Sequence, residues 1–142
     1  SDVYKRQAYG WTGNDKLFGG DGADLLAGGD DKDQLNGDAG DDALYGEAGN
    51  DKLWGGAGGD TLSGGADKDS LYGGTGIDFL YGDGGNDKLW GEEDNDQLVG
   101  NDGNDSLEGG AGNDNVFGDD GLDTLVGGAG DDSLSGGGDL DQ

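Results

Sequence analysis

The chain has 142 residues and a net charge of −26, from 33 acidic and 7 basic side chains. This charge argues against nucleic acid and anionic membrane surfaces as partners, because their phosphates would be repelled. No apolar run is long enough for membrane insertion, and a chain without cysteine forms no disulfide. We therefore expect the chain to bind cations.

Residues 1–9 do not follow the pattern of the rest of the chain. They contain Lys5 and Arg6, two of the seven basic residues. Such a leader either caps the repeats that follow it or is an artefact of sequence assembly, and both readings stay open. We predict a boundary after Tyr9 and one repeat domain over residues 10–142.

From Gly10 to Ser135 the chain consists of fourteen nine-residue units without an insertion or deletion, and an incomplete fifteenth begins at Gly136. Every unit has glycine at position one and aspartate at position six. Position eight is leucine in thirteen complete units and Val116 in the other. Positions one, two and four hold 34 of the 37 glycines, so glycine has a fixed place in the unit and is not a linker composition.

The last three residues of each unit alternate in direction, with position eight facing inward, and this is the period of a β-strand. The six residues before them, rich in glycine and aspartate, are typical of a turn. Two strands and two turns close one coil every 18 residues, and successive coils stack in parallel about 4.8 Å apart. We predict an all-β fold, a right-handed parallel β-roll (a β-helix solenoid) of about seven coils with two three-residue strands per coil.

The position-six aspartates recur every 18 residues along each side of the coil, which places carboxylate beside carboxylate. A thin core of leucines cannot offset this repulsion without counter-ions. Carboxylates and turn carbonyls of two neighbouring coils make an all-oxygen cage, which suits Ca²⁺, and we expect about 12–13 such ions. The predicted metal ligands are Asp15, Asp24, Asp33, Asp42, Asp51, Asp60, Asp69, Asp78, Asp87, Asp96, Asp105, Asp114, Asp123, Asp132 and Asp141.

Three units carry a resemblance to a known family: GGDGADLLA at Gly19, GGAGGDTLS at Gly55 and GGAGNDNVF at Gly109. They resemble the nonapeptide GGxGxDxUx of RTX (repeat-in-toxin) proteins, a haemolysin-type calcium-binding repeat. The resemblance extends from Gly10 to Gln142. It implies a β-roll that bacteria release by type I secretion, that leaves the cell unfolded and that folds on meeting external Ca²⁺.

The resemblance also implies which atoms hold each ion. An ion would lie between the turns of adjacent coils, bound by the aspartates and by main-chain carbonyls of the first four positions. For one site, the first coil would contribute Asp24 and the carbonyls of Gly20 and Gly22. The next coil would contribute Asp42 and the carbonyls of Gly37 and Ala39.

Aspartate replaces glycine at position four in some units, among them those of Asp31, Asp67 and Asp94. A left-handed backbone costs aspartate more than glycine, although aspartate tolerates it better than most residues. We expect strained or weaker sites near these three residues.

We predict a calcium-binding structural module that is secreted or held at the bacterial cell surface, as a fragment of a longer RTX protein with neighbouring domains. An enzyme is not expected, because the chain has no histidine and no cysteine and each carboxylate has a structural use. A disordered acidic tract is the alternative that differs only by the absence of metal.

A second hypothesis is an adhesive or ligand-binding surface for a carbohydrate or a protein. It rests on outward-facing residues of positions seven and nine. One predicted face carries Lys16, Lys52, Lys88, Phe18, Trp54, Tyr72 and Trp90, and the other carries Tyr45, Phe79, Tyr81 and Phe117. Such aromatic side chains equally stabilise their cross-strand neighbours on an exposed sheet.

Overall fold

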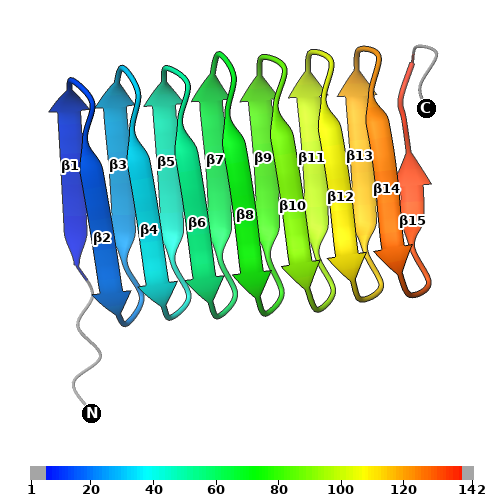
Figure 1. Ribbon diagram of the computed structural model, residues 1–142, viewed down its shortest axis with the longest axis horizontal. Coiled ribbons are helices and arrows are strands. Elements are labelled where there is room, and N and C mark those ends of the chain that lie inside the picture. Colours follow the sequence, from blue (N-terminus) through cyan, green and yellow to red (C-terminus); the bar gives the residue numbers. More distant parts are fainter. Residues whose placement is uncertain (1–5, 139–142) are drawn as a thin grey trace.

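The computed structural model describes residues 6–138, which form two parallel sheets and no helix. Figure 1 shows the odd-numbered strands running one way and the even-numbered strands the other, joined by short turns at both edges. The strands are β1 (Gln7–Thr12), β2 (Lys16–Asp21), β3 (Leu25–Asp30), β4 (Gln34–Ala39), β5 (Ala43–Ala48), β6 (Lys52–Ala57), β7 (Thr61–Ala66), β8 (Ser70–Thr75), β9 (Phe79–Gly84), β10 (Lys88–Glu93), β11 (Gln97–Asp102), β12 (Ser106–Ala111), β13 (Asn115–Asp120), β14 (Thr124–Ala129) and β15 (Ser133–Ser135).

The register confirms the predicted coil of 18 residues. Odd strands form an eight-stranded sheet in the order β1-β3-β5-β7-β9-β11-β13-β15, and even strands form a seven-stranded sheet from β2 to β14. Each strand pairs in parallel with the strand two places on, so that Leu44 lies opposite Leu62 and Leu62 opposite Leu80. The fold is therefore the expected parallel β-roll of about seven coils; its right-handed sense stays a prediction.

The strands are longer than the predicted three residues. All but β15 are six residues long and extend through position three of the next unit, as in β6 (Lys52–Ala57). Positions one to three of the next unit continue the strand, and position two pairs with position two of the adjacent coil whether or not it is glycine, as Asp38 does with Gly56. The turn shrinks to positions four to six, for example residues 58–60 between β6 and β7.

The position-eight side chains form the core as two facing files, one from each sheet. These side chains are almost completely inaccessible to solvent from Leu26 to Val116, as predicted. Leu17 and Leu125 pack against the core near its two ends and are partly buried. The core is thus one leucine deep from each sheet.

The first strand begins inside the segment that was expected to precede the repeats. β1 starts at Gln7, and Ala8 takes the place of the position-eight leucine against the core. The main-chain N–H of Arg6 donates to Asp24 Oδ1 at 2.6 Å, and its guanidinium donates to the Gly19 carbonyl oxygen at 3.0 Å. The rest of the leader and the predicted ligand Asp141 lie outside the described residues.

Residues 6–138 contain no helix that is long and apolar enough to cross a membrane.

Candidate metal centre

The turns lie in two rows, one at each edge of the roll (Figure 1), and each turn carries one predicted ligand. The upper row lies in the turns that lead from odd to even strands, and the lower row in the turns that lead from even to odd strands. The upper row consists of Asp15, Asp33, Asp51, Asp69, Asp87, Asp105 and Asp123. The lower row consists of Asp24, Asp42, Asp60, Asp78, Asp96, Asp114 and Asp132. All except Asp15 and Asp132, at the ends, are buried.

One carboxylate oxygen of every aspartate in the two rows except Asp15 accepts a main-chain N–H from the coil before it. Asp51 Oδ1 accepts the main-chain N–H of Asp33 at 2.7 Å, and Asp60 Oδ1 accepts that of Asp42 at 2.8 Å. The same bond recurs along both rows at 2.7–3.0 Å. Each carboxylate is therefore held in a defined orientation by an 18-residue contact.

The other carboxylate oxygen is buried and has no hydrogen-bond partner in twelve of these aspartates. A buried polar atom without a partner is costly, and a buried charge more so. The twelve are Asp15, Asp24, Asp33, Asp42, Asp51, Asp60, Asp69, Asp78, Asp87, Asp96, Asp105 and Asp114.

The position-one glycine leaves the space that these oxygens face. A Cβ built on Gly46 would lie 2.5 Å from Asp51 Oδ2 and 2.5 Å from the carbonyl oxygen of Gly64 in the next coil. Any larger residue would fill this space. Two oxygens from adjacent coils therefore converge where only glycine fits.

Other main-chain carbonyls also point into the gap between coils. The carbonyl oxygen of Gly22, at position four, is directed at Gly40 of the next coil, and that of Gly37 lies beside Gly19 together with Asp24 Oδ2. Of the carbonyls expected to complete this site, that of Ala39 accepts the Gly22 N–H at 2.7 Å. The complete ligand set of this site stays a prediction.

The donor set fits a hard cation. No three acidic side chains within residues 6–138 converge on one point, so carboxylates alone form no cage. A cation in a gap would be held by one or two carboxylates together with main-chain carbonyl oxygens. Oxygen ligands of this kind are those that Ca²⁺ takes, six to eight at a time and in flexible geometry.

Burial makes ionisation of the metal-free rows unfavourable. The pKa of Asp69 and of Asp78 rises from 3.8 to about 7, because burial disfavours the charged form and neighbouring carboxylates add repulsion. For Asp51 and Asp60 the same causes raise the pKa to about 6. A cation between the carboxylates would remove both costs.

Position four has the left-handed backbone that was expected, while weaker binding near the aspartates at this position stays a prediction. Position two shows the same backbone, which was missed. Asp31, Asp67 and Asp94 have φ of 84°, 81° and 78°, in the left-handed region. Position two has positive φ as well, including Glu47 at 77° and Trp11 at 75°. The eight glycines at position two were the available signal.

A second hydrogen-bond ladder at position five was also missed. Asn86 Oδ1 accepts the N–H of Asn104 at 2.9 Å, and Asn104 Oδ1 accepts that of Leu122 at 2.9 Å. This ladder runs in the opposite direction to the aspartate ladder, from donor in the later coil to acceptor in the earlier one. Six asparagines at position five were its trace in the sequence.

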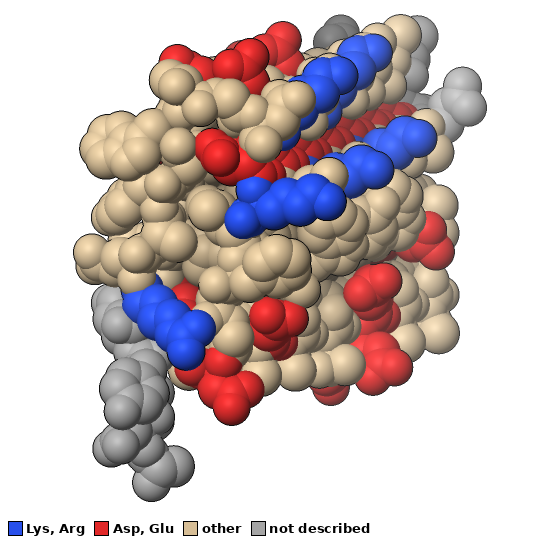
Figure 2. Space-filling view, turned by 60° about the vertical axis from the view of Figure 1, so that its left-hand side comes forward, with Lys and Arg blue, Asp and Glu red and all other residues tan. Residues whose placement is uncertain are grey.

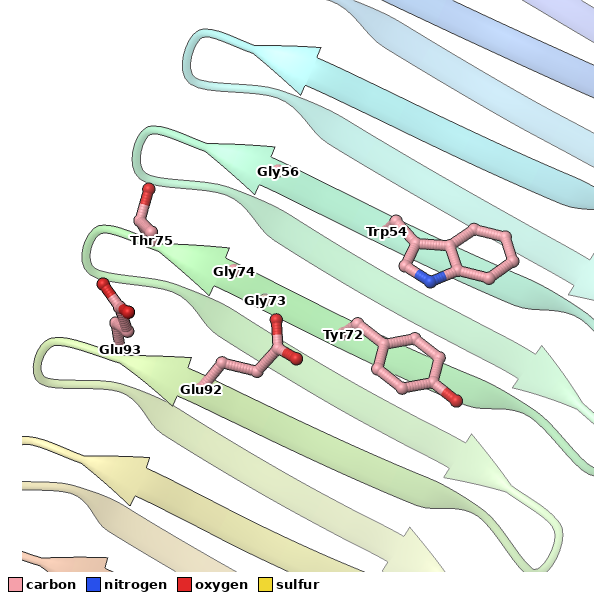
Figure 3. Close-up of a pocket in the computed structure, with 8 residues that line it drawn as sticks. All are labelled: Trp54, Gly56, Tyr72, Gly73, Gly74, Thr75, Glu92 and Glu93. Carbon is pink, nitrogen blue, oxygen red and sulfur yellow. The ribbon is translucent and has the colours of Figure 1, made fainter.

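Three outward aromatic residues of the even sheet, Trp54, Tyr72 and Trp90, stack on one another, whereas Phe18 is separated from them by Asn36. The ring centroids of Trp54 and Tyr72 are 5.7 Å apart and those of Tyr72 and Trp90 4.6 Å apart, with nearly parallel planes. Beside them Glu92 and Glu93 help to line a shallow hollow of about 420 Å³ (Figure 3). These aromatic rings stack face to face with one another. Packing between neighbouring strands therefore explains their alignment without an external ligand.

The odd sheet has no continuous aromatic file. Ser63 stands between Tyr45 and Tyr81, and Val99 between Tyr81 and Phe117. The arrangement gives the adhesive-surface hypothesis no support.

Two ladders of buried carboxylates, facing carbonyl-lined gaps in a parallel β-roll, define a calcium-binding repeat module. The chain belongs to the family of the RTX calcium-binding nonapeptide repeat. The family model, which spans four copies of the repeat, matches residues 9–44, 27–62, 36–71, 63–98, 90–125 and 117–142. A comparison with curated proteins found no match.

Proposed function

We propose that this chain is a structural module that folds when Ca²⁺ fills the gaps between its coils, outside the cell, within a longer secreted bacterial protein. The observation that carries the proposal is the set of twelve buried carboxylate oxygens without a hydrogen-bond partner. No side-chain donor bonds to them, and eleven of the twelve, all except that of Asp33, lie beside a main-chain carbonyl oxygen of the neighbouring coil.

The balance of charge supports a metal-dependent fold. The net charge of −26 opposes a compact state, and folding buries a further carboxylate with almost every nonapeptide. Sites of this ligand type in extracellular modules bind Ca²⁺ with Kd of about 10⁻⁴–10⁻³ M. Binding that is coupled to folding at such concentrations would keep the chain unfolded wherever free Ca²⁺ is far lower.

Secretion follows from this reading and from the family. RTX repeats occur in secreted bacterial proteins, and a chain that stays unfolded without Ca²⁺ suits export through a narrow channel before it folds outside. The β-roll is a structural calcium-binding fold, so we assign any catalytic or toxic activity to neighbouring domains of the longer protein.

Circular dichroism of the chain during a Ca²⁺ titration from excess chelator tests the proposal. We expect a disordered spectrum in chelator and a cooperative gain of β-signal at about 0.1–1 mM Ca²⁺. Mg²⁺ at equal concentration should fold the chain poorly, because it demands near-ideal octahedral geometry and dehydrates reluctantly. The titration is run at pH 8, where the buried carboxylates are ionised, and a full β-signal in excess chelator at this pH would refute the proposal.

A further inference from the structure

Every lysine among the described residues flanks the upper row of aspartates. Lys16, Lys52 and Lys88 stand at position seven of alternate upper turns, and Lys32 and Lys68 stand at position five of the turns between them. One lysine thus accompanies each of the first five upper aspartates, alternately on one side and the other. Figure 2 shows the result, two blue rows with a red row between them.

The lower row has no lysine at either position. Among residues 6–138, Arg6 is the one cationic residue on this side, and its guanidinium donates to the Gly19 carbonyl oxygen in β2, ahead of the first lower turn. Acidity does not distinguish the rows, since positions one to six carry fifteen carboxylates along the upper row and fourteen along the lower. The lysines are therefore the main electrostatic difference between two otherwise similar edges.

The lysines lie near the carboxylates but do not remove the cost of ionising them. Lys68 and Lys88 line a polar groove of about 550 Å³, which Asp69, Asp87 and Asp105 also line. Burial and neighbouring carboxylates nevertheless raise the pKa of Asp69 to about 7. All five lysines are exposed, so their ammonium groups act on a cation in the row through space and across solvent.

We propose that the two rows bind Ca²⁺ unequally, with four weaker sites in the gaps between the first five upper aspartates. The inference rests on the proposed function and extends it to the order of filling. Each of these gaps, from Asp15 to Asp87, has a lysine on both of its coils. One positive charge about 10 Å from a divalent ion lowers its affinity about two- to threefold in physiological salt, and two lower it about fivefold.

At the remaining sites this effect is smaller or absent. The upper gap from Asp87 to Asp105 has Lys88 alone, and the gap from Asp105 to Asp123 has no lysine. The lower row and the C-terminal end of the upper row therefore fill first. The exposed lysines offset part of the repulsion between the first five upper aspartates. The roll is therefore complete once the other ions are bound, and the four lysine-flanked gaps take up Ca²⁺ at higher concentration.

The test measures two curves over the same Ca²⁺ titration. One is the number of bound ions, from equilibrium dialysis, and the other is the β-signal, from circular dichroism. In the unaltered chain, the β-signal should be complete while about four ions remain to be bound, at a free Ca²⁺ concentration about fivefold higher. A variant with glutamine at all five lysines should bring the two curves together. A matched variant with arginine at all five keeps the charge and should keep them apart.

Three results would overturn the inference: coincident curves in the unaltered chain, separate curves that persist with glutamine, or curves that merge with arginine. The single pair Lys52→Gln and Lys52→Arg serves as a second comparison if the fivefold variant does not fold, and only the glutamine change should tighten the late ions, by about two- to threefold. A different result would refute the proposed function: a circular dichroism spectrum that does not change when Ca²⁺ is added.

Discussion

The substitution Asp60→Asn isolates the contribution of one buried carboxylate. Asp60 is fully buried, its Oδ1 accepts the Asp42 N–H at 2.8 Å and its Oδ2 has no partner. Asparagine has the same shape and keeps an oxygen for the Asp42 N–H. What it removes is the charge and the oxygen that faces the gap beside Gly55, so we expect one ion to be lost, or two if the carboxylate serves the gaps on both sides.

The size of the effect follows from ligand linkage. With Kd of about 1 mM, one ion stabilises the folded state by about 1.4 kcal/mol at 10 mM Ca²⁺ and by about 0.4 kcal/mol at 1 mM. Asp60→Asn should therefore lower the free energy of unfolding by about 1.4–2.8 kcal/mol at the higher concentration and by about 0.4–0.8 kcal/mol at the lower.

Urea denaturation at both Ca²⁺ concentrations, followed by circular dichroism, measures these losses. Asp41→Asn is the matched control, because Asp41 is an exposed neighbour whose Oδ1 accepts the Gly59 N–H at 2.9 Å, a bond that asparagine can keep. We expect this control to change stability by less than about 0.5 kcal/mol. A loss for Asp60→Asn that is the same at both Ca²⁺ concentrations would show that the carboxylate holds no ion.

Three further predictions concern the core, the backbone at position two and the effect of pH. The substitutions are measured by urea denaturation, and the pH effect by circular dichroism alone. With Ca²⁺ present, Leu62→Ala should cost about 2–5 kcal/mol, because this side chain is completely buried in the core. Trp54→Ala, which loses a stacking contact on the outer face, should cost at most about 1.5 kcal/mol, and an equal loss for both would contradict the assigned core. Glu47→Gly should gain about 1 kcal/mol, because φ of Glu47 is 77° and glycine adopts it without strain; a loss would mean that the glutamate side chain stabilises the roll. In chelator, β-signal should appear near pH 4 and be absent at pH 8. Burial and neighbouring carboxylates raise the folded-state pKa of Asp78 from 3.8 to about 7, so the metal-free fold loses stability as the pH rises through that range, and a chelated chain that folds better at pH 8 would refute this sign.

The coil, the core and the aspartate rows could be predicted because one strict period determines all three. A leucine at every ninth residue can be buried only if the strands alternate between two sheets, and this places Leu44, Leu62 and Leu80 in one file. The same spacing puts the aspartates into two rows with no further information.

The hydrogen bonds between coils were less predictable, because they join residues 18 apart and leave little trace in any one unit. The ladder from Asn86 to Leu122 is an example, since its last donor is the main chain of a residue with no polar side chain. Strand length was wrong for a related reason. Glycine is usually evidence against a strand, yet Gly55 and Gly56 extend β6 because the absence of a side chain lets adjacent coils approach.

Each nonapeptide needs a cation to neutralise its buried carboxylate, and this need does not depend on the number of coils in the roll. A globular domain buries a larger fraction of its surface as it grows, so a few buried charges become easier to accommodate. In a stacked array each coil contacts only its neighbours. Each added nonapeptide then brings one buried apolar side chain and one buried carboxylate two residues apart, as with Leu62 and Asp60. The number of buried apolar side chains and the number of buried carboxylates therefore rise together. With its carboxylates ionised, this sequence needs cations to fold at any number of coils.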